Sequence, residues 1–224
     1  MGNLCYEHEQ NDYVHAAPHE LLRPKRDRLR SALAGCGRVL EVGMNGGHSA
    51  LVSLSSNPTL ELHAVDICEH RYAYRAAEWL RNEFGDRFIF HEGDCRVVLP
   101  RLAAAGHRYD GFHIDGAKFT YFEDVLNASQ MISGQSAMIV MDDSNQPAVQ
   151  RTWSALIRLR VVAHTAEFPP MPSSERYRNQ VGHLRALPPW LRAGLSPFDY
   201  YLEARRKVPP YLARARRRIL PSRS

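Results

Sequence analysis

Apolar and polar positions along the chain follow two periods, one of about 2 residues and one of about 3.6 residues, which predict strands and helices respectively. Runs such as Arg38–Val42 and Ala137–Met141 are short and almost continuously apolar, as in strands that are buried on both faces. Longer amphipathic stretches lie between such runs. The first, Leu21–Ala34, has its leucines on one side and is followed by Gly35 and Gly37, which end it. The pattern predicts an α/β protein.

After this first helix, strands and helices follow in turn. The predicted strands are Arg38–Val42, Leu60–Val65, Arg87–His91, Gly111–Ile114 and Ala137–Met141, and the predicted helices are Ser49–Ser55, Tyr72–Phe84, Val97–Ala105, Phe122–Ile132 and Pro147–Leu159. Five βα units in sequence predict a parallel sheet that is covered on both faces. Two further strands, 160–168 and 180–187, have no helix between them, so we expect an antiparallel pair to close the sheet.

Length and composition place the chain among ordinary globular proteins. It has 224 residues, of which 44% are hydrophobic and 24% charged, so it should fold around one core. No apolar run approaches the ~20 residues that cross a bilayer, and the four cysteines form no CxxC pair. We therefore expect a soluble, cytoplasmic protein with three parts: an irregular segment (1–20), a folded domain (21–187) and an extension (188–224).

The positive charge is gathered at the carboxyl end. The net charge is +5, but residues 185–224 hold 10 basic and 2 acidic side chains, whereas residues 1–184 are mildly acidic. We therefore expect no nucleic-acid partner for the folded body. Within the basic extension, residues 188–224, apolar residues recur at rough helical spacing. This pattern fits a helix on an anionic membrane, and the favoured alternative is a solvated basic extension or a helix packed on the body or on a second copy in a homodimer.

A glycine turn follows the first strand. The segment from Val39 to Ser49 reads VLEVGMNGGHS, an apolar strand that runs through glycines into a helix. Glycine lets the backbone approach a ligand closely, and the amino end of the helix offers free N–H groups. The spacing departs from the G-x-G-x-x-G fingerprint, which makes a nicotinamide cofactor, and hence an oxidoreductase, the weaker interpretation.

Acidic residues end the next two strands. Asp66 closes the second predicted strand, about 20 residues after the glycine turn, where a carboxylate accepts hydrogen bonds from a ribose diol. Asp94 and Cys95 follow the third strand and could bracket an adenine ring. The order and spacing of these features together indicate a nucleotide-type cofactor.

With the motif E-x-G-x-x-G-G and Asp66 as the acid of the second strand, the chain resembles the class I S-adenosylmethionine-dependent methyltransferases. The resemblance implies a Rossmann-like three-layer sandwich with a mostly parallel seven-stranded sheet whose last strand is antiparallel. The cofactor-binding residues that it implies are Glu41, Gly43, Gly46, Gly47, Ser49, Asp66, Asp94, Cys95 and Asp115. The glycine turn would hold the methionine part of S-adenosylmethionine, Asp66 the ribose, and Asp94 with Cys95 the adenine.

Carboxylates also follow the fourth and fifth strands. Asp115 comes directly after one strand, with Lys118 three residues later, and Asp142 and Asp143 follow the other. Three unpaired carboxylates in one cleft repel one another, so they favour a bound cation, with Mg²⁺ the expected ion and Asp115, Asp142 and Asp143 its ligands. One of the two adjacent aspartates could instead cap the helix that starts at Pro147.

This second pattern resembles the cation-dependent O-methyltransferases and a related bacterial group that includes sugar O-methyltransferases. The latter carry D-G-x-H and then D-D before a V-x-R-x-W-like helix. Asp142-Asp143 and the segment Gln146 to Trp153 fit this pattern, whereas Ala117 and Lys118 depart from its D-G-D-H version. The resemblance implies methyl transfer to a hydroxyl of a small molecule or sugar, with Asp115 and Lys118 as catalytic residues and Lys118 as the base. A binding module that keeps the cofactor fold but acts through its basic extension is the alternative from a different class.

Overall fold

The structure is a computed structural model, which describes residues 22–188 and Gly194. The chain divides into two units, Met1–Leu187 and Pro188–Ser224, and the sheet lies in the first. The predicted irregular segment and nearly all of the basic extension lie outside the described residues, so their roles stay predictions. Among the described residues, every helix is too short or too polar to span a bilayer.

The described unit is built on a seven-stranded mixed sheet with the order β3-β2-β1-β4-β5-β7-β6. The strands are β1 (Arg38–Val42), β2 (Glu61–Asp66), β3 (Phe88–Glu92), β4 (Gly111–Ile114), β5 (Ser136–Met141), β6 (Val162–His164) and β7 (Gln180–Arg185). β1 to β5 are parallel, and β7 is antiparallel to both β5 and β6. The predicted sheet and its antiparallel closing pair are confirmed.

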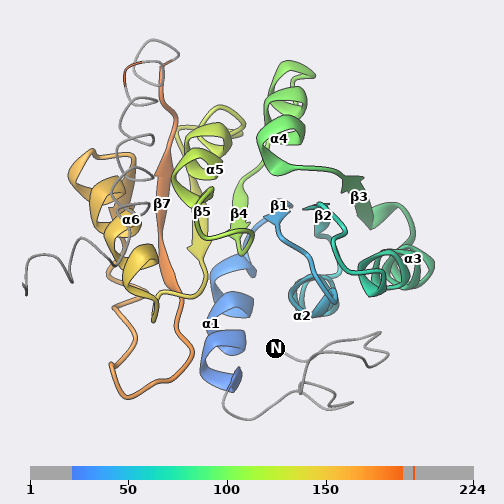
Figure 1. The fold of residues 1–224 in the computed structure, drawn as a ribbon, viewed down its shortest axis with the longest axis horizontal. Helices are drawn as coiled ribbons and strands as arrows, with labels where there is room; N and C mark the ends of the chain where they lie inside the picture. The colour runs from blue at the N-terminus through green and yellow to red at the C-terminus, as the bar shows by residue number, and fades with distance from the viewer. Residues whose placement is uncertain (1–21, 189–193, 195–224) are drawn as a thin grey trace, which may run out of the picture. The chain divides into compact units, whose positions relative to one another are not determined.

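Helices pack in two layers on this sheet. They are α1 (Arg23–Leu33), α2 (His48–Ser56), α3 (Tyr72–Phe84), α4 (Cys95–Ala104), α5 (Tyr121–Ala128) and α6 (Pro147–Arg158), with a 3₁₀ turn at Gly85–Arg87. α1 packs on α2 and α2 on α3, whereas α4 packs on α5 and α5 on α6. Figure 1 shows α1, α2 and α3 along one side of the row of strands and α4 and α5 along the other.

The register of the central strands brings their carboxyl ends to one edge. Val42 of β1 pairs with Val65 of β2 and Ile114 of β4, and Ile114 pairs with Met141 of β5. The residues that directly follow these four are Gly43, Asp66, Asp115 and Asp142. Ligands of open α/β sheets bind at this edge.

Among the predicted elements that are shorter in the structure are α5 and β6. α5 ends at Ala128 rather than Ile132, because the chain turns there and forms hydrogen bonds with the backbone of Tyr109. The Tyr109 N–H donates to Met131 O at 2.7 Å, and the Tyr109 carbonyl accepts from Ser133 N at 2.9 Å. β6 covers only Val162–His164 of the predicted 160–168. Arg160 has a left-handed backbone conformation, with a φ of 57°, so the turn that ends α6 includes Arg160 and the strand cannot begin there.

Candidate functional site

A cavity of about 340 Å³ opens at the carboxyl ends of the parallel strands. Its lining includes Gly43, Asp66, Asp94, Cys95, Asp115 and Phe119. The first five of these were predicted to bind a cofactor. The volume lies within the range of about 300–1,000 Å³ that is typical of small-molecule sites.

Gly43 allows the tip of β1 to lie against the tip of β4. Its φ is +87°, and a Cβ at this position would lie 2.5 Å from the carbonyl oxygen of Asp115. A side chain would therefore both strain the backbone and push the β4 loop away. The turn then leads to α2, whose N-cap is Gly47 with a φ of 78° and without a capping side chain. The first N–H groups of α2 thus have no side-chain cap.

Asp66 organises the turns on both sides of the cavity. Its Oδ2 accepts a hydrogen bond of 2.8 Å from the Asn45 N–H, and its Oδ1 accepts one of 2.7 Å from the Cys68 N–H. Each carboxylate oxygen has two lone pairs, so the group can still accept from a ligand hydroxyl. Asp66 therefore joins the glycine turn to the end of β2 and also faces the cavity.

Other predicted cofactor residues lie beside the cavity or are engaged elsewhere. Gly46, Gly47 and Ser49 are buried in the turn and the start of α2 and do not line the cavity. Asp94 lines it, but its Oδ1 caps α4 by accepting from the Arg96 N–H at 2.9 Å, and its Oδ2 lies 2.6 Å from the Arg96 guanidinium.

Glu41 is buried below the cavity, with 1% of its surface exposed. Its Oε1 lies 2.9 Å from Nδ1 of His113 on the neighbouring strand β4. Its Oε2 has no hydrogen-bond partner among the described residues. Because a buried polar atom without a partner is costly, Oε2 is positioned to take a donor from a bound ligand.

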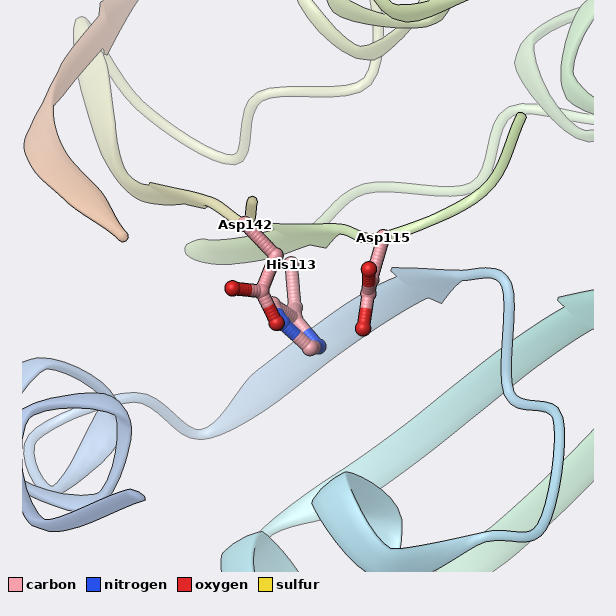
Figure 2. Close-up of side chains that lie close together, drawn as sticks. All are labelled: His113, Asp115 and Asp142. Carbon is pink, nitrogen blue, oxygen red and sulfur yellow. The ribbon is translucent and has the colours of Figure 1, made fainter. Parts of the chain in front are cut away.

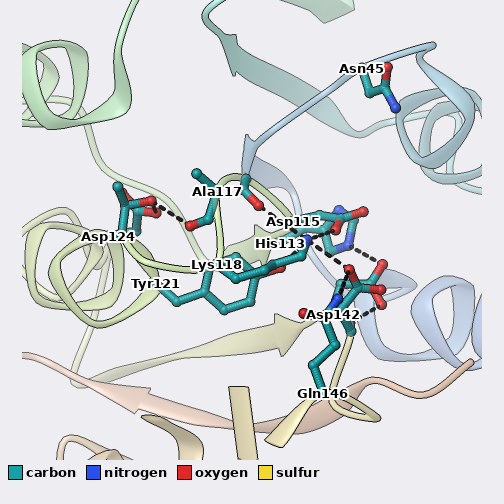
Figure 3. Close-up of polar contacts among 12 residues, drawn as sticks. Asn45, His113, Asp115, Ala117, Lys118, Tyr121, Asp124, Asp142 and Gln146 are labelled. Carbon is teal, nitrogen blue, oxygen red and sulfur yellow. Dashed lines mark hydrogen bonds and ion pairs between the residues drawn. The ribbon is translucent and has the colours of Figure 1, made fainter. Parts of the chain in front are cut away.

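The carboxylate cluster of Asp115, Asp142 and Asp143 forms as predicted at the ends of β4 and β5, but each carboxylate contacts a lysine. Lys118 Nζ lies 3.0 Å from Asp115 Oδ1 and 2.8 Å from Asp143 Oδ2. It also donates to the hydroxyl of Tyr121 at 2.9 Å (Figure 3). Lys118 therefore ties the two strand ends together.

A second lysine, Lys25, reaches the cluster from α1. Its Nζ lies 2.5 Å from Asp142 Oδ2 and 3.8 Å from Asp143 Oδ1. The side chains of Lys25 and Asp142 are 8% and 0% exposed, so this is a buried ion pair.

The charges of the cluster shift several pKa values. Burial raises the pKa of Asp115 to about 6, with a further contribution from Asp142. Burial opposes ionisation of Asp142 too, but Lys25 and His113 hold its pKa well below the usual range. Burial alone would lower the pKa of Lys118, yet Asp115 and Asp143 raise it above its ordinary value. Of Asp115 and Asp142, Asp115 is thus the carboxylate that more readily accepts a proton near neutral pH.

His113 is buried on β4 between two acids. Burial lowers its pKa, but contacts with Asp142 and Glu41 outweigh this effect and raise the pKa to about 10. His113 is therefore a cationic donor that holds Glu41.

His113, Asp115 and Asp142 are close enough to share a metal ion, since one potential ligand atom from each lies within 4.8 Å of the others (Figure 2). The surroundings of these atoms do not fit a resident Mg²⁺ ion. The Oδ2 of Asp142 is in contact with the Lys25 ammonium, and Nδ1 of His113 is engaged with Glu41. The Nε2 of His113 has no hydrogen-bond partner among the described residues and lies 3.7 Å from Asp142 Oδ2, but the raised pKa of His113 keeps both of its nitrogens protonated, and a protonated nitrogen is not a metal ligand. The Asp115 and Asp143 carboxylates are both in contact with Lys118.

Sequence reasoning missed Lys25, although a signal was present. Leu22, Lys25, Leu29 and Leu33 are spaced by three or four residues, which places a lysine on the apolar face of α1. All four are buried. A lysine is almost never buried unless it is paired, so this position predicts an acidic partner.

The fold and the site have counterparts among known proteins. Residues 40–144 match the family model described as a methyltransferase domain, in agreement with the predicted class. No curated protein sequence matches the chain.

Similar solved structures include the O-methyltransferase TomG from Streptomyces achromogenes, involved in tomaymycin synthesis and bound to S-adenosylmethionine. TomG is 22% identical, with a TM-score of 0.59, over 79% of this chain and 84% of TomG. An O-methyltransferase from Bacillus cereus in complex with S-adenosylhomocysteine is 15% identical, with a TM-score of 0.57, over 77% and 93% of the two chains. Cofactor-bound Rv0187 from MTB is 18% identical, with a TM-score of 0.61, over 78% and 84%. At these identities the likeness establishes the fold.

Proposed function

We propose that the chain is a class I S-adenosylmethionine-dependent methyltransferase, as the methyltransferase-domain match over residues 40–144 supports, and that it methylates a hydroxyl oxygen of a small molecule. The observation that carries this proposal is the position of Asp115. This carboxylate lines the cofactor cavity and also belongs to the carboxylate cluster, where Lys118 holds it. A proton acceptor therefore lies next to the place where a methyl donor would bind.

The cavity residues suit the proposed cofactor. S-adenosylmethionine, when bound, supplies an electrophilic methyl group on a sulfonium centre. Asp66 lines the cavity and has lone pairs for the ribose hydroxyls. Outside the cavity lining, the uncapped start of α2 and the unpartnered Oε2 of Glu41 suit the two charged groups of the methionine part. Ile67 and Phe119, which are 60% and 42% exposed, offer apolar surface to the adenine.

The carboxylate cluster provides the group that accepts the proton of the acceptor hydroxyl. A hydroxyl is a weak nucleophile until a base takes its proton, and a base is most effective when its pKa lies near the working pH. We assign this role to Asp115, whose raised pKa suits it. The raised pKa of Lys118 keeps it an ammonium, so it is less suited to be the base and better suited to stabilise negative charge on the acceptor oxygen.

The acceptor is proposed to be a small molecule with a phenolic or sugar hydroxyl. TomG is described as acting in tomaymycin synthesis, which supports an acceptor of this size. The expected Mg²⁺ ion has no step in this proposal, because the cluster carboxylates are already paired with lysines. Membrane contact through the basic extension, a homodimer and a cytoplasmic location also stay predictions.

The test is methyl transfer by the full chain from methyl-labelled S-adenosylmethionine to a panel of catechols, simple phenols and sugars. We expect labelled ether products with at least one acceptor class, and Asp115→Asn should lower the rate at which they form by about 10²–10⁴-fold. Asp86→Asn is the matched control, because Asp86 is exposed in the 3₁₀ turn after α3. Labelled product on nitrogen or sulfur acceptors but on none of the hydroxyls would contradict O-methylation.

Calorimetry separates the competing cofactor. S-adenosylhomocysteine should bind the full chain, whereas NADH should not, and the reverse result would restore the nicotinamide interpretation. Tight binding of S-adenosylhomocysteine with no transfer to any acceptor would favour the non-catalytic binding module.

A further inference from the structure

The ammonium of Lys25 is built into the carboxylate cluster from outside the sheet. Every other charged member of the cluster lies on or just after β4 or β5, whereas Lys25 lies in the first turn of α1. Its Nζ contacts Asp142 at 2.5 Å and lies 3.8 Å from Asp143. With its side chain only 8% exposed, Lys25 has little freedom to turn toward solvent.

The backbone at Lys25 is also fixed. The carbonyl of Lys25 accepts a hydrogen bond of 3.1 Å from Nδ2 of Asn179, which precedes β7 and is 1% exposed. Asn179 thus ties the first turn of α1 to the segment that leads into β7. The position of the ammonium is therefore set by two elements that are remote in sequence.

The two lysines match the charge of one divalent ion. Lys25 contacts Asp142 and faces Asp143, and Lys118 contacts Asp115 and Asp143, so each cluster carboxylate has an ammonium and Asp143 faces both. We propose that Lys25 and Lys118 together supply the positive charge for which a divalent cation would otherwise be needed. In this proposal the site binds no such cation and works without one. Lys25 is a positioning residue, because it acts through Asp142 and Asp143.

The geometry explains why an ion and Lys25 exclude each other. A Mg²⁺ ion binds oxygen at 2.0–2.1 Å, so an ion on Asp142 Oδ2 would lie within about 4.6 Å of the Lys25 Nζ that contacts the same oxygen. Two like charges at this separation in a buried site repel strongly. Removal of Lys25 would leave Asp142 and Asp143 with less positive charge and open space beside Oδ2.

The role of Lys25 in transfer rests on the proposed function, but cation binding can be measured without any acceptor. The probe is Mn²⁺, whose free aqueous signal in electron paramagnetic resonance falls when the ion binds. The full chain is titrated as wild type, Lys25→Met, Lys25→Arg and Arg30→Met. Arg30 is the matched control, because it lies on the same helix with its side chain 56% exposed.

We expect the wild type, Lys25→Arg and Arg30→Met to leave the Mn²⁺ signal unchanged, and Lys25→Met to bind Mn²⁺ at least tenfold more tightly than the wild type. Stoichiometric Mn²⁺ binding by the wild type would overturn the proposal, as would a Lys25→Met protein that binds no better than the wild type. If Lys25→Met does not fold, the Mn²⁺ titrations of the wild type and of Lys25→Arg still decide whether the site excludes a divalent cation.

The activity arm uses the wild type alone. Methyl transfer in excess EDTA should equal that in added Mg²⁺, and activity that is lost on chelation and restored by Mg²⁺ would overturn the proposal. Absence of transfer under every condition would instead contradict the proposed function and leave the Mn²⁺ result to judge the lysine pair.

Discussion

Substitution of Lys25 by methionine should strongly destabilise the folded protein. Methionine has a similar length and is apolar, so the change removes the ammonium while filling much of its space. Asp142, which is 0% exposed, would then keep its charge without its nearest cation. The perturbation therefore isolates the electrostatic contribution of Lys25.

The magnitude follows from the burial and the distance. At 2.5 Å and an effective dielectric constant of about 20, the gross attraction is about 7 kcal/mol. The desolvation of both ions offsets part of this, and breaking a buried pair by removing one partner typically costs about 3–5 kcal/mol. For a domain of this size such a loss corresponds to a fall in Tm of roughly 6–20 °C.

The assay is urea unfolding at pH 7, followed by both circular dichroism and tryptophan fluorescence. Lys25→Met should lower the free energy of unfolding by about 3–5 kcal/mol. Lys25→Met combined with Asp142→Asn should be less destabilised than the sum of the two single variants, because the charge left alone has also been removed. A single-variant loss under about 1 kcal/mol, or strictly additive effects, would refute a buried, coupled ion pair.

Three further predictions concern other parts of the site and fold. Asp115→Asn should lower the rate of methyl transfer by about 10²–10⁴-fold, and the wild-type rate should rise with pH through an inflection near 6; a pH-independent rate would argue against Asp115 as the base. Gly43→Ala should weaken S-adenosylhomocysteine binding in calorimetry by tenfold or more, because its Cβ would lie 2.5 Å from Asp115 O. Gly35→Ala, with no atom within 4 Å of its Cβ, is the control, and equal affinities would contradict the steric argument. Burial and the adjacent His63 lower the pKa of His91 to about 4 from 6.5, so its neutral form stabilises the fold above pH 6.5 and this stability is lost as the pH falls toward 4. In urea titrations His91→Gln should reduce that pH dependence, and an unchanged curve would exclude His91 as its source.

The parallel sheet and the cofactor half of the site could be predicted because their signals are local. A strand, a glycine turn and the start of a helix are adjacent in sequence, and parallel strands bring their carboxyl ends to the same edge. Gly43, Asp66 and Asp115 could therefore be placed together from sequence before any contact was known. The ends of α5 and β6 were harder to predict. For α5, the reason is that the backbone of Tyr109, which hydrogen-bonds to Met131, lies more than twenty residues earlier in the chain.

The charge state of the carboxylate cluster could not be read from the cluster itself. Asp115, Asp142 and Asp143 read as a cation site when only the ends of β4 and β5 are considered, since three carboxylates need positive charge. Lys25, which pairs with Asp142, lies in α1, before the first strand. Asn179, before β7, hydrogen-bonds to the carbonyl of Lys25 and so fixes the first turn of α1.

This dependence on α1 gives a sequence criterion for proteins with the same fold and the same aspartates. A lysine on the apolar face of the helix before the first strand indicates a cluster that is neutralised by the protein itself, because only pairing with an acid makes its burial tolerable. An apolar residue there leaves the aspartates in need of an external cation. Metal requirement among such chains should therefore follow the residue at the position of Lys25, and a chain that has this lysine and still needs a divalent cation would break the rule.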